Sequence, residues 1–191
     1  LIEFLKLHPI LKSSGPEIHF FDNLKNFALG LSWYLKQMPI LEAGQIAMEK
    51  TPGMSSVLLH TKFLLVVRDP VNRLISDYNQ RGKTIPRLRI HIYALGGHKY
   101  LISSLAESFP SSSFHIVNGD EFIAKPWEEL QDVERFLGVY PHIQERNFYF
   151  NETKGFYCSR DIRSKGVWEC SRSKCLSKSK GRKKPPVEAE T

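Results

Sequence analysis

The chain has 191 residues, of which 41% are hydrophobic and 25% charged, and its formal net charge is +7. These values fit one ordinary globular domain and exclude a wholly disordered, collagen-like or coiled-coil chain. The longest apolar run, Phe63 to Val67, is far shorter than the roughly 20 residues needed to span a bilayer. Leu1 opens directly into a helical pattern without the features of a signal peptide. We therefore expect a single soluble domain over residues 1–191.

The positive charge is concentrated near the C-terminus. Residues 1–153 contain 16 basic and 16 acidic side chains, whereas residues 154–184 contain 11 basic and 2 acidic ones. A short acidic tail, residues 185–191, follows. Such a basic segment attracts polyanions, among them nucleic acid, anionic lipid, phosphorylated cofactors and sulfated sugars. A solvated basic tail explains the same charge equally well.

The three cysteines, Cys158, Cys170 and Cys175, also lie in the basic segment. A structural zinc site needs four nitrogen or sulfur ligands, and this segment has no histidine, so we expect no metal. A disulfide is the better interpretation, and it implies an oxidising compartment with one cysteine left over. The glycosylation sequon at Asn151 is weak evidence alone, but it points in the same direction, towards the secretory pathway.

Helical spacing of apolar residues predicts two helices in the first part of the chain. A short one begins at Leu1 and ends at His8-Pro9. A longer one runs from Phe27 to Met38 and stops before Pro39.

Residues 17–21 (EIHFF) alternate between polar and apolar side chains, which indicates a short strand or extended segment. A period of two places Glu17 and His19 on one face and Ile18 and Phe20 on the other.

The remaining pattern alternates strands with helices. Lys62 to Val67 (KFLLVV) is typical of a strand buried on both faces of a parallel sheet, and Asp69 and Pro70 are suited to start a helix after it. Alternation of this kind favours a three-layer α/β/α domain with a central, mostly parallel sheet. The other predicted elements are strands at 45–49 and 114–117, a turn at 118–119, helices at 100–109 and 127–137, and a loop at 80–90.

Ligands of parallel sheets bind beyond the carboxyl ends of the strands, and three candidate sites fall there. At the first, Arg68, a capped helix and the Ser76 hydroxyl can converge on a phosphate, although Arg68 can equally form a structural ion pair with a neighbour. The second combines Glu17, His19 and Asp22, which can perform acid–base chemistry but are also typical of a solvated edge.

The third candidate, Glu49-Lys50-Thr51, is a charged pair at a strand end, and such a pair is usually a surface salt bridge. A glycine-containing basic loop (Lys180, Gly181, Arg182, Lys183, Lys184) can bind an anion, but its composition favours a linker or a localisation-like run.

Seven blocks occur in an order that closely resembles the heparan sulfate glucosamine 3-O-sulfotransferases. They are GPEIHFFDN, LSWYLKQMP, MEKTP, LLVVRDPVNRLISDY, FHIVNGDEFI, FYFNETKGFYC and CLSKSKGR. The resemblance implies a P-loop NTPase-like sulfotransferase fold that transfers a sulfuryl group from 3′-phosphoadenylyl sulfate to a glucosamine 3-hydroxyl in heparan sulfate.

The resemblance also implies roles for individual residues. Glu17 is expected to be the general base, with His19 and Lys50 completing the catalytic set. Residues expected to hold the nucleotide are Arg68, Ser76, Tyr157 and the loop Lys180, Gly181, Arg182, Lys183 and Lys184. Residues expected to line the acceptor site are Glu17, Ile18, His19, Phe20, Phe21, Asp22, Asn23, Glu49, Lys50 and Thr51.

The family pattern further implies a Cys158–Cys175 disulfide within a basic segment over 158–184, and a glycan on Asn151. It implies a monomer in the Golgi lumen, attached to a membrane only through an anchor outside this sequence.

The sequence also departs from the family pattern. The family's P-loop turn and its strand are not present, two internal stretches are shorter, residues 161–174 carry an insertion, and the C-terminal helix is not present. We therefore expect an incomplete member of the family. The alternatives are a catalytically inactive heparan sulfate-binding protein and, supported by charge alone, a nucleic-acid-binding domain, which we do not expect because no nucleic-acid-binding motif occurs.

Overall fold

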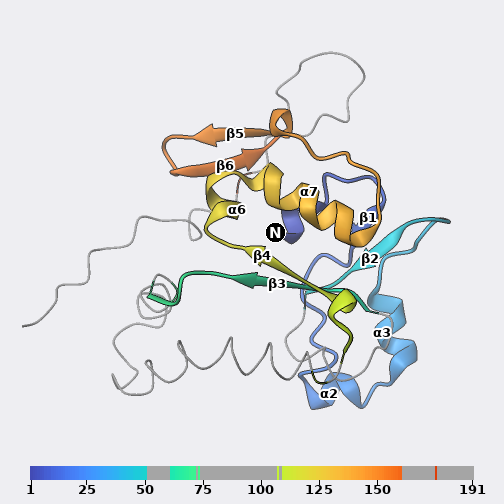
Figure 1. Ribbon diagram of the computed structural model, residues 1–191. Coiled ribbons are helices and arrows are strands. Elements are labelled where there is room, and N and C mark those ends of the chain that lie inside the picture. Colours follow the sequence, from blue (N-terminus) through green and yellow to red (C-terminus); the bar gives the residue numbers. More distant parts are fainter. Residues whose placement is uncertain (51–60, 72, 74–106, 108, 161–174, 176–191) are drawn as a thin grey trace, which may run out of the picture.

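The computed structural model describes residues 1–50, 61–71, 73, 107, 109–160 and 175. Within these residues helices mix with short strands that form three two-stranded sheets, of which two are parallel (Figure 1). The α/β class predicted from the sequence is confirmed, whereas the three-layer arrangement stays a prediction. No helix in this part of the chain has the length and apolar character to cross a bilayer.

The centre of the molecule is a parallel pair of strands with a helix packed beside it. Strand β3 (Phe63–Val67) pairs along its whole length with β4 (Phe114–Asn118). The chain leaves β4 through a turn into α6 (Glu121–Ala124) and then α7 (Pro126–Leu137). Proline in the first turn of α7 and left-handed Gly138 at its end are ordinary helix boundary signals. These elements confirm the strands and the helix expected there.

The N-terminal part supplies a second parallel pair. Helix α1 (Ile2–Leu5) leads into β1 (Leu11–Ser13), which pairs with β2 (Ile46–Met48). Strand β2 and the short first helix were predicted, but β1 was not. Three residues give too little alternation to stand out from the flanking serines and glycine.

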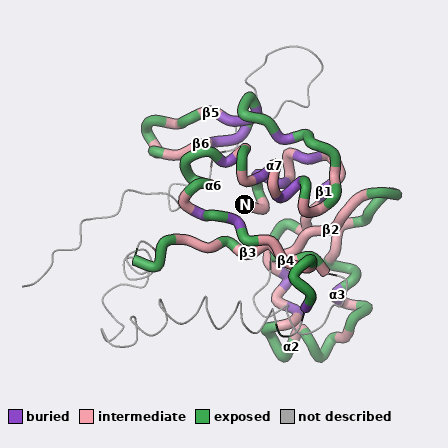
Figure 2. The backbone as a smooth tube through the Cα atoms, in the orientation of Figure 1, coloured by how far each residue is buried: buried purple, intermediate pink, exposed green. Residues whose placement is uncertain are grey.

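A single apolar core joins these pieces (Figure 2). Val117 of β4 and Leu130 and Val133 of α7 are fully buried. These two positions of α7 therefore face the core. The other buried members of the core are Phe4, Leu5, Leu11, Ile143 and Phe148.

A buried polar network fastens the N-terminus to the end of α7. The ring of His8 is fully buried; its Nε2 lies 2.9 Å from the Tyr140 carbonyl oxygen, and its Nδ1 accepts from the Ile10 amide. Glu134, also buried, accepts through Oε1 from the amides of His142 and Ile143 at 3.1 and 2.9 Å. The contact between His8 and Tyr140 joins residues 132 positions apart.

The aromatic stretch after the core helix forms an antiparallel hairpin of β5 (Phe148–Asn151) and β6 (Phe156–Ser159). Two short 3-10 helices, Ser111–Ser113 (η2) and Glu145–Asn147 (η3), precede β4 and β5. A disulfide joins Cys158 of β6 to Cys175, with 4.7 Å between their Cα atoms, as the family resemblance implies. The hairpin itself was not expected from the sequence.

The single helix predicted from Phe27 to Met38 is wrong. The structure has two helices, α2 (Leu24–Phe27) and α3 (Leu31–Gln37), separated by Gly30 at φ 79°. Glycine reaches this left-handed conformation without the penalty that a Cβ imposes, so the chain turns there despite the helical spacing of its apolar residues. Only Tyr34 of the predicted apolar stripe is buried.

Two further expectations need correction. Residues 17–21 form no strand, because His19 has a φ of 54° that interrupts extended backbone. Strand β3 is not buried on both faces, since Val66 is 41% exposed. The helix predicted at 100–109 and the loop at 80–90 lie largely or wholly outside the described residues.

Candidate active site

Segment 17–22 is held in place by the packing of its apolar side chains. Ile18 and Phe20 are buried and form a small cluster with Tyr34, whose ring centroid lies 4.9 Å from that of Phe20. The Asn26 side-chain amide donates to the carbonyl oxygens of Ile18 and His19 at 3.2 and 3.1 Å. The predicted division of faces is therefore correct in outcome, although a turn produces it and not a strand. Polar side chains emerge on the opposite side.

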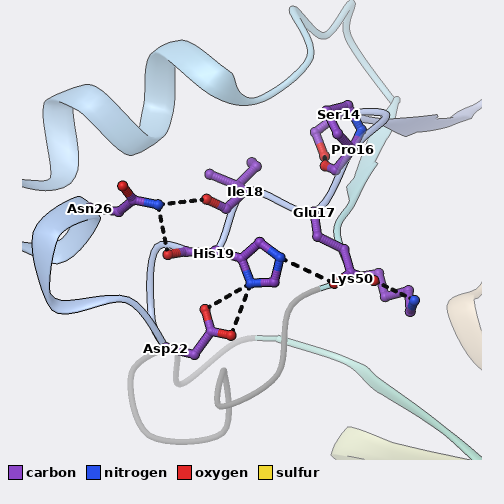
Figure 3. A network of polar contacts seen from close by, with 8 residues as sticks. All are labelled: Ser14, Pro16, Glu17, Ile18, His19, Asp22, Asn26 and Lys50. Atoms are coloured by element: carbon purple, nitrogen blue, oxygen red, sulfur yellow. Dashed lines mark hydrogen bonds and ion pairs between the residues drawn. The ribbon is translucent and has the colours of Figure 1, made fainter. Parts of the chain in front are cut away.

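Glu17, His19, Asp22 and Lys50 meet in one polar group, which we call the carboxylate–imidazole cluster (Figure 3). Oε1 of Glu17 accepts from the Lys50 ammonium, and Oε2 lies 3.3 Å from Nε2 of His19. On the other side of the ring, Nδ1 lies 3.0 Å from Oδ2 of Asp22. An imidazole thus bridges two carboxylates, one of which also holds a lysine.

The cluster is open to solvent, with side-chain exposures of 33% for Glu17 and 45% for His19. The hydrogen bond from Lys50 lowers the pKa of Glu17 below its ordinary value of 4.5, so this carboxylate is ionised at neutral pH. The hydrogen bond to Asp22 raises the pKa of His19 above 6.5, with the charges of Asp22 and Glu17 adding to the effect. An accessible, ionised carboxylate can accept a proton from a bound hydroxyl group.

Lys50 lies just after the end of β2, and the residue before it, Glu49, is held by a hydrogen bond. The phenol of Tyr34 on α3 donates to Oε2 of Glu49 at 2.5 Å. Burial and this hydrogen bond raise the pKa of Tyr34, so the phenol stays protonated and keeps its donor role. The contact ties α3 to the residue before Lys50.

Arg68 lies at the carboxyl end of β3, as predicted, and is held there by an acidic side chain. Its Nε and Nη2 donate to Oδ1 of Asp120 at 3.1 and 2.9 Å. Oδ2 of Asp120 accepts from the backbone amide of Asp69 at 2.9 Å. The Asp69 amide and then Arg68 lower the pKa of Asp120. The structural pairing weighed for Arg68 is therefore present, with Asp120 as its partner.

Other expected site residues have clear structural positions. Tyr157 packs edge-on against Trp127, with 5.3 Å between the ring centroids, and contacts Phe150. Asn23 caps α2 by accepting from the Lys25 amide, and Phe21 lies edge-on against Tyr34. Ile18 and Phe20 support the site from the core. Thr51, Ser76 and the loop Lys180, Gly181, Arg182, Lys183 and Lys184 lie outside the described residues.

The structure brings Glu17, His19, Asp22 and Lys50 together in the carboxylate–imidazole cluster. Among the described residues, no hydrogen bond or ion pair connects this cluster with Arg68. In Figure 1 the carboxyl end of β3 lies on the left of the molecule, whereas α2 and α3 lie on the right. Nor do the described residues include a group of histidine, cysteine and carboxylate side chains arranged to bind a metal ion.

Sequence reasoning missed Tyr34, Gly119 and Asp120. The sequence predicts the turn at 118–119 and a strand at 114–117, but not which strand it pairs with. Parallel pairing of that strand with β3 would have placed the turn beside Arg68.

Two parallel strand pairs with helices, and polar groups at strand ends, are features of an α/β domain. Residues 1–188 match the family model described as the sulfotransferase domain, and the chain belongs to this family. A crystal structure of a sulfotransferase from Alicyclobacillus acidocaldarius superposes with a TM-score of 0.59 at 15% sequence identity. It covers 80% of this chain and 81% of the other, which supports the fold alone.

Among curated proteins, the chain is similar to heparan sulfate glucosamine 3-O-sulfotransferases. It is 37% identical to enzyme 5 of Mus musculus over 98% of this chain and 61% of the relative. It is also 37% identical to enzyme 3B1 of Homo sapiens over 100% of this chain and 54% of the relative. The chain therefore spans somewhat more than half the length of these relatives.

Proposed function

We propose that the protein transfers a sulfuryl group from 3′-phosphoadenylyl sulfate to the 3-hydroxyl of glucosamine in heparan sulfate. Membership of the sulfotransferase family and the similarity to enzymes of that name support the proposal. The observation that carries it is the contact of an accessible Glu17 carboxylate with both Lys50 and His19.

In this proposal Glu17 accepts the proton as the sugar hydroxyl attacks sulfur, the bond from sulfur to the 5′-phosphate oxygen breaks, and 3′-phosphoadenosine 5′-phosphate leaves. The low pKa of Glu17 keeps the base ionised, and the Lys50 and His19 contacts fix the direction of its oxygens. General base catalysis of this kind contributes about 10²- to 10⁴-fold. Lys50 and protonated His19 also supply positive charge for the sulfate and carboxylate groups of the polysaccharide.

The residues assigned to the acceptor site divide into exposed side chains, which can contact the sugar, and buried ones, which cannot. Asp22 contacts His19 on the side of the ring away from Glu17, and Asn23, Phe21 and Glu49 belong to the segments that flank the cluster. Thr51 is assigned to the acceptor site together with them. Ile18 and Phe20, which are buried, act through the position of their neighbours. The basic segment over 158–184 is proposed to attract the anionic polysaccharide.

The nucleotide is assigned to Arg68, Ser76, Tyr157 and the loop Lys180, Gly181, Arg182, Lys183 and Lys184. Arg68 fits a phosphate chemically, because a guanidinium held at the end of a parallel strand presents several donors of fixed direction. Bound there, the donor would supply the sulfuryl group, and these residues would bind and orient it.

The cellular setting is part of the proposal. We place the protein in the Golgi lumen, since the Cys158–Cys175 disulfide requires an oxidising compartment. A glycan on Asn151, a monomeric state and heparan sulfate as the partner are proposed with it.

The test is a transfer assay with the donor nucleotide and a heparan sulfate oligosaccharide, read by mass spectrometry and by the position of the added sulfate. We expect one sulfuryl group at the glucosamine 3-hydroxyl. Glu17→Gln should lower the rate about 10²-fold or more without loss of nucleotide binding.

Glu3→Gln is the matched control, since Glu3 also pairs with a lysine, Lys6, on an exposed surface. It should leave the rate unchanged. Sulfate at another position, or an active Glu17→Gln protein, would contradict the proposal.

A further inference from the structure

The turn that follows β4 lies directly against Arg68. The amide of Gly119 donates to the carbonyl oxygen of Val67 at 2.7 Å, which extends the contact between the two strands by one step. The turn therefore passes the first atoms of the Arg68 side chain at close range.

Gly119 is needed for this approach. A Cβ on Gly119 would collide with Cγ of Arg68 and would lie only 3.0 Å from the Val67 carbonyl oxygen. The carbonyl belongs to the backbone of a paired strand, so it cannot move aside cheaply. A side chain at position 119 must therefore displace the stem of Arg68.

The next residue, Asp120, controls the other end of the same side chain. One carboxylate oxygen accepts from Nε and Nη2 of Arg68, and the other accepts from the Asp69 amide. Because a guanidinium is planar, holding its Nε–Nη2 edge fixes the direction of the donors on the opposite side. With side-chain exposures of 28% and 39%, the pair lies at the surface and within reach of a ligand.

Asp120 is itself held by further contacts. Its amide donates to Oδ1 of Asn118 at 3.0 Å, and the amide of Asn118 donates to Oε2 of Glu129 on α7 at 2.8 Å. A continuous chain of hydrogen bonds thus runs from the core helix to the guanidinium.

We propose that Gly119 and Asp120 are positioning residues that set the Arg68 guanidinium for the 3′-phosphate of the donor nucleotide. The inference rests on the proposed function, which assigns that phosphate to Arg68. Asp120 has two opposing effects, since its negative charge repels a phosphate while its hydrogen bonds hold the cation in place. The proposal is that the second effect is larger.

The test compares the affinity of 3′-phosphoadenosine 5′-phosphate with that of adenosine 5′-phosphate, which lacks the 3′-phosphate. The ratio of the two affinities reports on the 3′-phosphate alone, whereas a general loss of folding lowers both. Calorimetric titration should show that Asp120→Ala reduces the ratio about tenfold and leaves adenosine 5′-phosphate binding unchanged.

Two further variants separate geometry from charge. Gly119→Ala keeps every charge but should also reduce the ratio. Asp120→Asn should give an intermediate ratio, because its amide oxygen can still accept from Arg68. Asp132→Ala is the matched control, since Asp132 pairs with Arg135 on an exposed part of α7.

The affinity ratios can also contradict the role given to Asp120. An unchanged or increased ratio in Asp120→Ala would overturn the inference, as would a further loss when Asp120→Ala is added to Arg68→Ala. If the native protein shows no preference for the 3′-phosphate, the nucleotide assignment fails and this inference fails with it. That result is visible in the native protein, so the two failures are distinguishable.

Discussion

At the scale of single residues, the unusual feature is an imidazole that bridges two carboxylates on an exposed turn. His19 adopts a left-handed φ of 54° without being glycine, asparagine or aspartate. Its conformation is supported by the Asn26 amide, which donates to the His19 carbonyl, and by buried residues on both sides. Backbone strain of this kind persists only where the surroundings fix it, and here it directs the ring towards Glu17 and Asp22.

The bridge predicts an altered titration of His19. Its pKa is raised above 6.5, mainly by the hydrogen bond to Asp22, and Asp22→Asn should return it towards 6.5. The protonated ring stabilises the folded cluster fully below the unfolded pKa, and this contribution is lost as the pH rises through the folded value. NMR titration of the imidazole measures the shift. An unchanged midpoint in Asp22→Asn would show that Asp22 is not its cause.

At the scale of elements, the sequence was informative where a pattern was long or continuous. Strand β3 and helix α7 were predicted because an apolar run and a helical stripe identify such elements. Helices α2 and α3 were merged because the spacing of apolar residues carries no sign of the φ that Gly30 adopts. The β5–β6 hairpin was missed because its aromatic residues lie on both faces, so its strands show no alternation of polar and apolar side chains.

Two neighbouring residues of β4 test which face of the strand packs against the core. Val117 is fully buried between β3 and α7, whereas Ile116 is 47% exposed. Val117→Ala should lower the free energy of unfolding by about 2 kcal/mol through lost burial and the cavity left behind. Ile116→Ala is the control on the same strand and should cost well under half as much. Chemical denaturation measures both values, and equal losses would contradict the packing.

The candidate site shows the same limit of sequence reasoning. Glu17, His19 and Asp22 were grouped correctly because they are close in sequence, and Lys50 joined them through the family resemblance. Asp120 is 52 positions from Arg68, so no local pattern reveals that they pair. Contacts of that range depend on the strand pairing, which the sequence alone did not give.

At the scale of the whole molecule, the disulfide links strand β6 of the hairpin to Cys175, further along the basic segment. Cys158 is fully buried, and Sγ of Cys175 lies 3.4 Å from the Tyr149 hydroxyl. The bond closes a loop of 17 residues in sequence, so its removal should cost about 3 kcal/mol of stability. Thermal unfolding with and without reductant measures this loss. An unchanged melting temperature after full reduction, checked by mass spectrometry, would contradict the expectation.

The buried contacts of His8 have a consequence for how the protein is made. The partner of His8, Tyr140, is 132 positions further along the chain. During synthesis residues 1–8 are made well before the surface that covers them, which exists only once the chain has grown past Tyr140. At ordinary rates of translation the apolar side chains of α1 therefore stay uncovered for about ten seconds. In that interval they form an apolar surface that a chaperone can bind.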